Sequence, residues 1–341
     1  MGIMTVLGPL QEDEIGHTQL HEHLLCDLSG YIAENDREAG APITLNNYFA
    51  TRVDRNNSTD MILDNRTDAI EAMVDYAAAG GTVLVDATPR GLGRDPEGLR
   101  EIALATNTHI VMGCGYYVSA FHSPAVATMS EDQICDEIVT DLETGVGPHR
   151  IRAGIIGEIG MSWPARADEV KVLRGAARAQ RLTGAALLIH PGRFAHAPAH
   201  HLQIVEAAGG DLSKTVMCHI DRTLFTFEQM RELASTGVVL EFDLFGTESS
   251  YYPPDPSVDL PNDGMRVRYI RALIEQGHGH QIVIAEDVCR KSQLKPHGGE
   301  GYDHILKRVV PLMRARGIRE DQIHQITQET PRRLLSLPLA V

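Results

Sequence analysis

The chain has 341 residues, long for an average single domain but suited to one large α/β barrel or two ordinary domains. Hydrophobic residues make up 43% and charged residues 23%, which excludes a disordered chain. The formal net charge of −15 argues against a nucleic-acid partner, and no apolar run approaches the ~18–20 residues that span a bilayer.

The N-terminus lacks the basic and apolar segments of a secretory leader, and the five cysteines form an odd, scattered set without a CxxC pair. Both features are typical of a reducing compartment, in which thiols pack as small apolar side chains. We therefore expect a cytoplasmic protein that acts on a small molecule, away from nucleic acids and membranes.

Eight short apolar runs, each ending in polar, glycine or proline residues, predict eight strands along the chain. They cover residues 16–25, 82–89, 109–117, 153–160, 185–191, 215–221, 237–243 and 281–287. Near-continuous apolar runs are typical of parallel strands that are buried on both faces.

Helical periodicity fills the spaces between these runs, most clearly over residues 66–79, 130–142, 228–235 and 265–276. Eight strand–helix units predict a single (β/α)8 TIM barrel spanning residues 1–341. A doubly wound sheet is the alternative, although no GxGxxG or GxxxxGK[ST] loop follows a strand. Residues 1–15 are expected to form an N-terminal extension or small hairpin, and the polar residues 29–67 a long loop that covers the substrate.

The first apolar run contains two histidines, His21 and His23, spaced so that both imidazoles point to one side of a strand. Alone this pair is weak evidence for a metal site, since the chain has 16 histidines. A second pair, His278 and His280, precedes a strand instead of ending one and is expected to lie in a solvated loop.

Four further residues strengthen the first pair because each stands near the end of a predicted strand: Glu158, His190, His219 and Asp287. The carboxyl ends of barrel strands surround one cavity. Burying so many ionisable groups together is costly unless a cation compensates their charge. Six nitrogen and oxygen ligands without cysteine suit two ions, zinc first, with manganese, cobalt or nickel as alternatives.

These motifs resemble the amidohydrolase superfamily and, within it, the phosphotriesterase family. The resemblance rests on HEH in the first predicted strand, GEIG in the fourth, His190 and His219 in the fifth and sixth, and Asp287 in the eighth. Residues 240–306 are most similar to the phosphotriesterase-related (resiniferatoxin-binding-like) proteins. The resemblance implies that His21, His23 and Asp287 hold the more buried ion and that His190 and His219 hold the other. It also implies that Glu158 bridges the ions, where other members use a carboxylated lysine.

Two departures from the family pattern bear on activity. Glu286 precedes Asp287 and is expected to add a negative charge beside the site. The histidine that organic-triester hydrolases use as a proton shuttle has no counterpart in residues 237–246, which argues against triesterase activity as the main function.

The predicted chemistry is hydrolysis. Two divalent ions can lower the pKa of a bridging water from 15.7 towards ~7, so that hydroxide attacks a carbonyl or phosphoryl centre at neutral pH. Asp287, a ligand with a free oxygen, is the expected proton acceptor and catalytic residue.

Several residues on the expected mouth of the barrel are candidates for substrate contact: Arg222, Tyr117, Arg193, Arg290 and Tyr251. Each has a structural alternative in loop packing or an internal ion pair. Asp221 is predicted to orient the ligand His219, with an internal salt bridge as its alternative.

The resemblance implies a small ester, lactone or N-acyl amide as substrate. The related-protein branch favours N-acyl amino acids or N-acyltaurines, whereas the wider family favours sugar-acid lactones. Promiscuous organophosphate hydrolysis and a metal-containing binding protein without turnover remain alternatives. Homodimers are common among such proteins, so a homodimer is expected by analogy.

Overall fold

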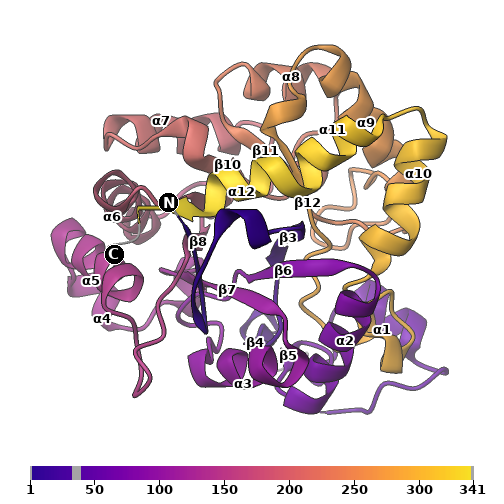
Figure 1. The fold of residues 1–341 in the computed structure, drawn as a ribbon, viewed down its shortest axis with the longest axis horizontal. Helices are drawn as coiled ribbons and strands as arrows, with labels where there is room; N and C mark the ends of the chain where they lie inside the picture. Colours follow the sequence, from indigo (N-terminus) through magenta and orange to yellow (C-terminus); the bar gives the residue numbers. More distant parts are fainter. Residues whose placement is uncertain (1, 33–39, 339–341) are drawn as a thin grey trace.

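The computed structural model describes residues 2–32 and 40–338, and its centre is a sheet of eight parallel strands (Figure 1). All eight predicted strands are confirmed, each shorter than its apolar run. In spatial order they are β3 (His17–Glu22), β6 (Gly81–Asp86), β7 (His109–Cys114), β8 (Ile155–Gly160), β9 (Leu187–His190), β10 (Thr215–Met217), β11 (Val239–Phe242) and β12 (Ile282–Ile284).

The first and last strands of this sheet are joined by backbone hydrogen bonds just beyond β12. The amide of Asp287 donates to the carbonyl of His21 at 3.3 Å, and the amide of His23 donates to that of Val288 at 3.1 Å. These bonds close the sheet into a (β/α)8 barrel. The doubly wound alternative is wrong, because such a sheet would leave two open edges.

Helices surround the ring of strands in Figure 1. The four predicted helices are confirmed as α2 (Arg66–Ala78), α5 (Glu131–Glu143), α8 (Phe227–Ala234) and α9 (Asp263–Glu275). The Ser130 side chain accepts from the Gln133 amide and the Gln133 side chain accepts from the Ser130 amide, so α5 begins with a capping box. The remaining helices are α1 (Tyr48–Asp54), α3 (Pro96–Thr106), α4 (Ala125–Thr128), α6 (Ala167–Thr183), α7 (Ala197–Ala207), α10 (Val310–Ala315), α11 (Glu320–His324) and α12 (Thr330–Leu335).

A separate apolar cluster fills the inside of the barrel. It combines inward-facing strand residues such as Leu20 and Leu188 with Ile3, Leu10, Leu334 and Leu335 from the two ends of the chain. Ile3 and Leu10 lie in an antiparallel sheet of β1 (Gly2–Thr5), β2 (Gly8–Leu10) and β13 (Ser336–Leu337), and Leu334 and Leu335 end α12, directly before β13. The termini therefore close the amino-terminal end of the barrel and leave the opposite end for the site.

The segment 29–67 is more regular than expected. It contains α1, and its strand β5 (Ile62–Leu63) pairs with β4 (Cys26–Asp27). Residues 33–39 of this predicted loop lie outside the described part of the chain. Tyr31, Arg55 and Met61 of this segment line a cavity at the carboxyl ends of the strands, so the segment forms part of the wall of the site.

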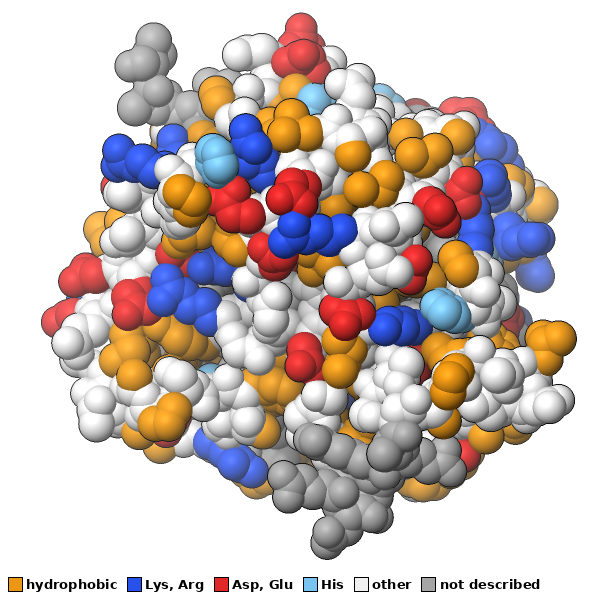
Figure 2. All heavy atoms as spheres, turned by 90° about the horizontal axis from the view of Figure 1, so that it is seen from below, with side chains coloured by type: hydrophobic (Ala, Val, Ile, Leu, Met, Phe, Trp, Pro, Cys, Tyr) orange, Lys and Arg blue, Asp and Glu red, His pale blue; other side chains and the backbone are white. Residues whose placement is uncertain are grey.

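The outer surface mixes side chains of all classes. On the face in Figure 2, lysine and arginine side chains alternate with acidic and apolar ones instead of forming one basic stripe. Among residues 2–32 and 40–338, no helix combines the length and apolar character needed to cross a membrane.

We expect Ile3→Ala to lower the free energy of unfolding by about 2–5 kcal/mol, because it opens a cavity at the closed end of the barrel, where Ile3 is fully buried. Denaturant unfolding measures this change. The control is Leu45→Ala, at a side chain that is 98% exposed, which should change stability by no more than about 0.5 kcal/mol. Equal effects of both substitutions would contradict the assigned role of β1.

Candidate metal centre

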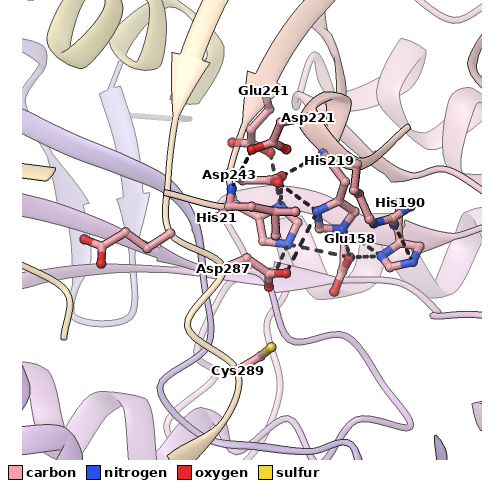
Figure 3. Close-up of polar contacts among 12 residues, drawn as sticks. His21, Glu158, His190, His219, Asp221, Glu241, Asp243, Asp287 and Cys289 are labelled. Carbon is pink, nitrogen blue, oxygen red and sulfur yellow. Dashed lines mark hydrogen bonds and ion pairs between the residues drawn. The ribbon is translucent and has the colours of Figure 1, made fainter. Parts of the chain in front are cut away.

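The structure brings the six predicted ligands together at the carboxyl ends of five strands, and Figure 3 labels all of them except His23. His21 lies in β3 and His23 directly follows it, Glu158 lies in β8, and His190 ends β9. His219 and Asp287 lie two and three residues beyond β10 and β12, respectively. Both adopt left-handed backbone conformations, with φ of 54° and 50°, and such strain in non-glycine residues is typical of functional sites.

Glu158 occupies the centre of this cluster. Its Oε2 atom lies 2.8 Å from His190 Nδ1, 3.4 Å from His219 Nε2 and 3.6 Å from His21 Nε2. Its Oε1 atom lies 3.4 Å from His23 Nε2, which is also 3.4 Å from Asp287 Oδ1. One carboxylate therefore faces all four imidazoles, three through Oε2 and one through Oε1.

The buried carboxylates and imidazoles of the cluster shift one another's pKa values. Burial alone would raise the pKa of Glu158, but the His190 and His21 imidazoles hold it well below its usual range. Burial alone would lower the pKa of His23, but the Asp287 and Glu158 carboxylates raise it to about 10. The buried carboxylates thus favour positive charge in their centre, which protons or a metal ion can supply.

Three of the histidines are oriented by hydrogen bonds between Nδ1 and residues outside the six-residue cluster. His21 Nδ1 lies 3.0 Å from Glu241 Oε2, His23 Nδ1 lies 2.9 Å from Thr88 Oγ1, and His219 Nδ1 lies 2.9 Å from Asp243 Oδ1. A proton on Nδ1 leaves the Nε2 lone pair directed into the cluster. This outer hydrogen bonding is typical of histidines that bind metals.

The donor set fits metal ions on a further observation. His21 Nε2 is buried and has no hydrogen-bond partner in the described structure, although it faces Glu158 and Asp287. Ligand atoms of His21, His23 and Asp287 lie close enough to share one ion, as do those of His21, Glu158 and His219. Cys218, Glu241 and Asp243 form a third such group with His21, on its Nδ1 side.

His190 is oriented differently, because Arg222 donates from its guanidinium to His190 Nε2 at 3.0 Å. A neutral imidazole that binds an ion through Nδ1 carries its proton on Nε2 and cannot accept this hydrogen bond. Ion binding at Nδ1 would therefore release Arg222 from the ring towards the cavity that it lines.

The prediction that Asp221 orients His219 is wrong. Asp221 accepts from Arg266 Nε at 2.6 Å, in an ion pair whose two side chains are fully buried. Asp243 takes the predicted role, since it accepts from both the backbone amide and Nδ1 of His219. The internal salt bridge, the stated alternative for Asp221, is confirmed.

The expectation that Glu286 adds negative charge to the site is also wrong. Its carboxyl accepts from Gln19 Nε2 and the Ile305 amide and does not line the cavity. Burial and the neighbouring Glu22 raise the pKa of Glu286 well above its usual range, which favours the neutral form.

A cavity of about 370 Å³ opens beside the cluster. Four predicted contact residues line it: Tyr117, Arg193, Arg222 and Arg290. Tyr251 does not line the cavity and is 52% exposed, whereas its neighbour Tyr252 does line it.

Two cavity residues, Tyr31 and Arg55, were not predicted from the sequence, because the long polar segment that contains them shows no periodic pattern. Tyr31 donates to Tyr117 Oη at 2.9 Å, and Tyr117 Oη lies 3.2 Å from His190 Nδ1.

Comparisons with known proteins identify the family of the chain and similar structures. The model of the phosphotriesterase family matches residues 1–335. The chain is 40% identical to an N-acetyltaurine hydrolase of Salmo salar, over 98% of this chain and 97% of that protein. A crystal structure of a resiniferatoxin-binding protein from Rhodobacter sphaeroides is 37% identical, with a TM-score of 0.93 over 98% of this chain and 95% of the other.

A third similar protein is the phosphotriesterase homology protein from Escherichia coli, whose structure holds phosphate in its active site. It is 28% identical, with a TM-score of 0.79 over 95% of this chain and 100% of the other.

We expect Asp243→Asn to weaken zinc affinity about 10–100-fold, because it removes the carboxylate that orients His219. Asp221→Asn is the matched control, since it should lower the free energy of unfolding by about 1–3 kcal/mol by removing one of the two carboxylates that pair with Arg266, yet keep zinc affinity near that of the parent. Zinc titration and denaturant unfolding measure the two effects. The reverse pattern would restore the orienting role to Asp221.

Proposed function

The chain belongs to the phosphotriesterase family, and on that premise we propose that it is a binuclear metal-dependent amidase of N-acyl amines that carry an acid group. The observation that carries the proposal is the arginine-lined cavity beside a cluster of histidines and carboxylates. The name shared by its relatives, N-acetyltaurine hydrolase, supplies the substrate class.

We assign His21, His23 and Asp287 to one ion, His190 and His219 to the other, and Glu158 to both. The distances around Glu158 support the shared assignment, because Oε1 lies 3.4 Å from His23 Nε2 whereas Oε2 lies 2.8 Å from His190 Nδ1 and 3.4 Å from His219 Nε2. Zinc suits this set of nitrogen and oxygen donors. When bound, two such ions lower the pKa of water and polarise a carbonyl oxygen.

Asp287 is the carboxylate that a reacting water can reach. Its side chain is 17% exposed, against 3% for Glu158. In the proposed reaction, the water oxygen adds to the substrate's carbonyl carbon while Asp287 takes the proton. Asp287 then gives the proton to the amine nitrogen as the carbon–nitrogen bond breaks, which yields a carboxylic acid and a free amine.

The chain's other residues orient the substrate. Arg222 lies between His190 and the backbone of Pro191 and carries no carboxylate partner among the described residues. Tyr117 places a hydroxyl beside His190 in the wall of the cavity. Both are positioned to bind polar atoms of a substrate whose carbonyl lies at the cluster.

We expect zinc-loaded protein to release taurine and acetate from N-acetyltaurine, because the cavity combines the hydrolytic cluster with uncompensated arginines. Amine release reports amide cleavage, and proton release reports the opening of sugar-acid lactones in parallel wells. Lactone turnover without amide turnover would make the chain a lactonase. If the zinc-bound protein hydrolysed neither the amide nor the lactones, the result would contradict a hydrolase and favour a binding protein.

We expect Asp287→Asn to lower kcat about 10²–10⁴-fold with little change in KM, since the proton acceptor is lost while the substrate contacts remain. The assay is run at saturating zinc with metal content measured on the same sample. Glu286→Gln is the neighbouring control and should retain turnover, because the Glu286 carboxyl contacts Gln19 and Ile305 and does not line the cavity. An unchanged kcat in Asp287→Asn would contradict the role of Asp287 as the proton acceptor.

A further inference from the structure

Four arginines line the cavity, and most of their charge is uncompensated. They are Arg55, Arg193, Arg222 and Arg290. Within the described residues, only Arg290 has a carboxylate within ion-pair distance, Asp60 Oδ2 at 3.5 Å. Many other arginines of the chain, such as Arg94 and Arg266, pair directly with carboxylates. The cavity therefore concentrates positive charge that the protein itself does not neutralise.

Arg55 has the fewest partners of the four. Its Nε atom is buried and makes no hydrogen bond in the described structure. Its guanidinium lies over the Tyr252 ring, 5.8 Å from the centroid. Burial and the neighbouring Arg290 lower the pKa of Arg55 to about 10, so the group is still charged at neutral pH. Arg55 is half-buried, with no carboxylate partner among the described residues, and a bound anion would compensate its charge.

Tyr252 holds two of these arginines in fixed positions. Its side chain is only 1% exposed, its ring faces Arg55, and its hydroxyl accepts from Arg193 Nε at 2.6 Å. Arg290 is held separately, because its guanidinium donates to the carbonyl of Arg52 at 3.1 Å. The three guanidinium groups are thus positioned before any ligand binds, which lowers the entropic cost of binding.

These three arginines are distinct from the hydrolytic cluster. Arg222 contacts His190, whereas Arg55, Arg193 and Arg290 form no hydrogen bond or ion pair with any of the six cluster residues in the described structure. Leu28, Met61, Leu244 and Pro253 add apolar surface to the same cavity. A ligand can therefore place one polar group at the cluster and a second at the arginines.

We propose that Arg55, Arg193 and Arg290 form an oxoanion site that binds the sulfonate or carboxylate on the amine side of the substrate, with Arg55 as the residue that selects for charge. The proposal rests on the amidase function above and names the determinant of its substrate class. Planar guanidinium groups suit such oxoanions because each can donate two parallel hydrogen bonds. The cavity of about 370 Å³ restricts the site to small substrates.

The kinetic test compares three amides of equal length: N-acetyltaurine, N-acetyl-β-alanine and the neutral N-propylacetamide. Arg55→Gln should lower kcat/KM for both anions about 10–100-fold, chiefly through KM, and leave the neutral amide unchanged. Arg55→Lys should restore part of the loss. The control is Arg308→Gln, an exposed outer-helix change of equal charge that should affect none of the three. Equal loss on the neutral amide, or no loss on the anions, would overturn the proposal.

A binding measurement separates this proposal from the amidase function. Calorimetry with ethanesulfonate, which has no bond to cleave, should show binding to the parent and to Arg308→Gln, and binding at least about tenfold weaker to Arg55→Gln. This result would support the oxoanion site even if the parent hydrolysed no amide. Absence of ethanesulfonate binding to the folded parent would overturn the site even if N-acetyltaurine were hydrolysed. Circular dichroism of each variant verifies that it is folded.

Discussion

The carboxylate of Glu158 stands between four imidazoles, and the arrangement of the rest of the site follows from the electrostatics of that position. Its side chain is 3% exposed, and those of His21, His23 and His219 are at most 2% exposed. A buried carboxylate and four buried imidazoles are unfavourable unless their charges are matched within a few ångströms. Only a closed ring of strands holds residues from β3, β8 and β9 at such distances without exposing any backbone edge.

This constraint explains why the two ends of the barrel differ so strongly in composition. Leu20, Val85 and Leu188 fill the interior towards the amino-terminal end, together with Ile3 and Leu335 from the chain termini. At the other end, polar residues are layered outward from the cluster. Glu241, Thr88 and Asp243 fix the outer nitrogens of His21, His23 and His219, and the arginines face the cavity. Stability and chemistry are therefore assigned to opposite ends of the same strands.

The sequence was sufficient for the parts of this structure that depend on local patterns. Each strand is an apolar run, and His190 or Asp287 stands out because a polar residue ends an otherwise buried segment. Contacts between distant segments could not be predicted in this way. Asp221 is two residues from His219 but pairs with Arg266, whereas Asp243 reaches His219 from the next strand. Arg55 belongs to a polar segment without periodicity, and only folding places it against Tyr252.

The central claim is that the six clustered residues hold two ions that share Glu158. Anomalous X-ray diffraction from zinc-loaded crystals, collected on both sides of the zinc edge, tests it most directly. We predict two peaks per chain: one within coordination distance of His21, His23 and Asp287, the other near His190 and His219, and both near Glu158. A single peak, or zinc bound by Cys218, Glu241 and Asp243 behind His21, would contradict the account.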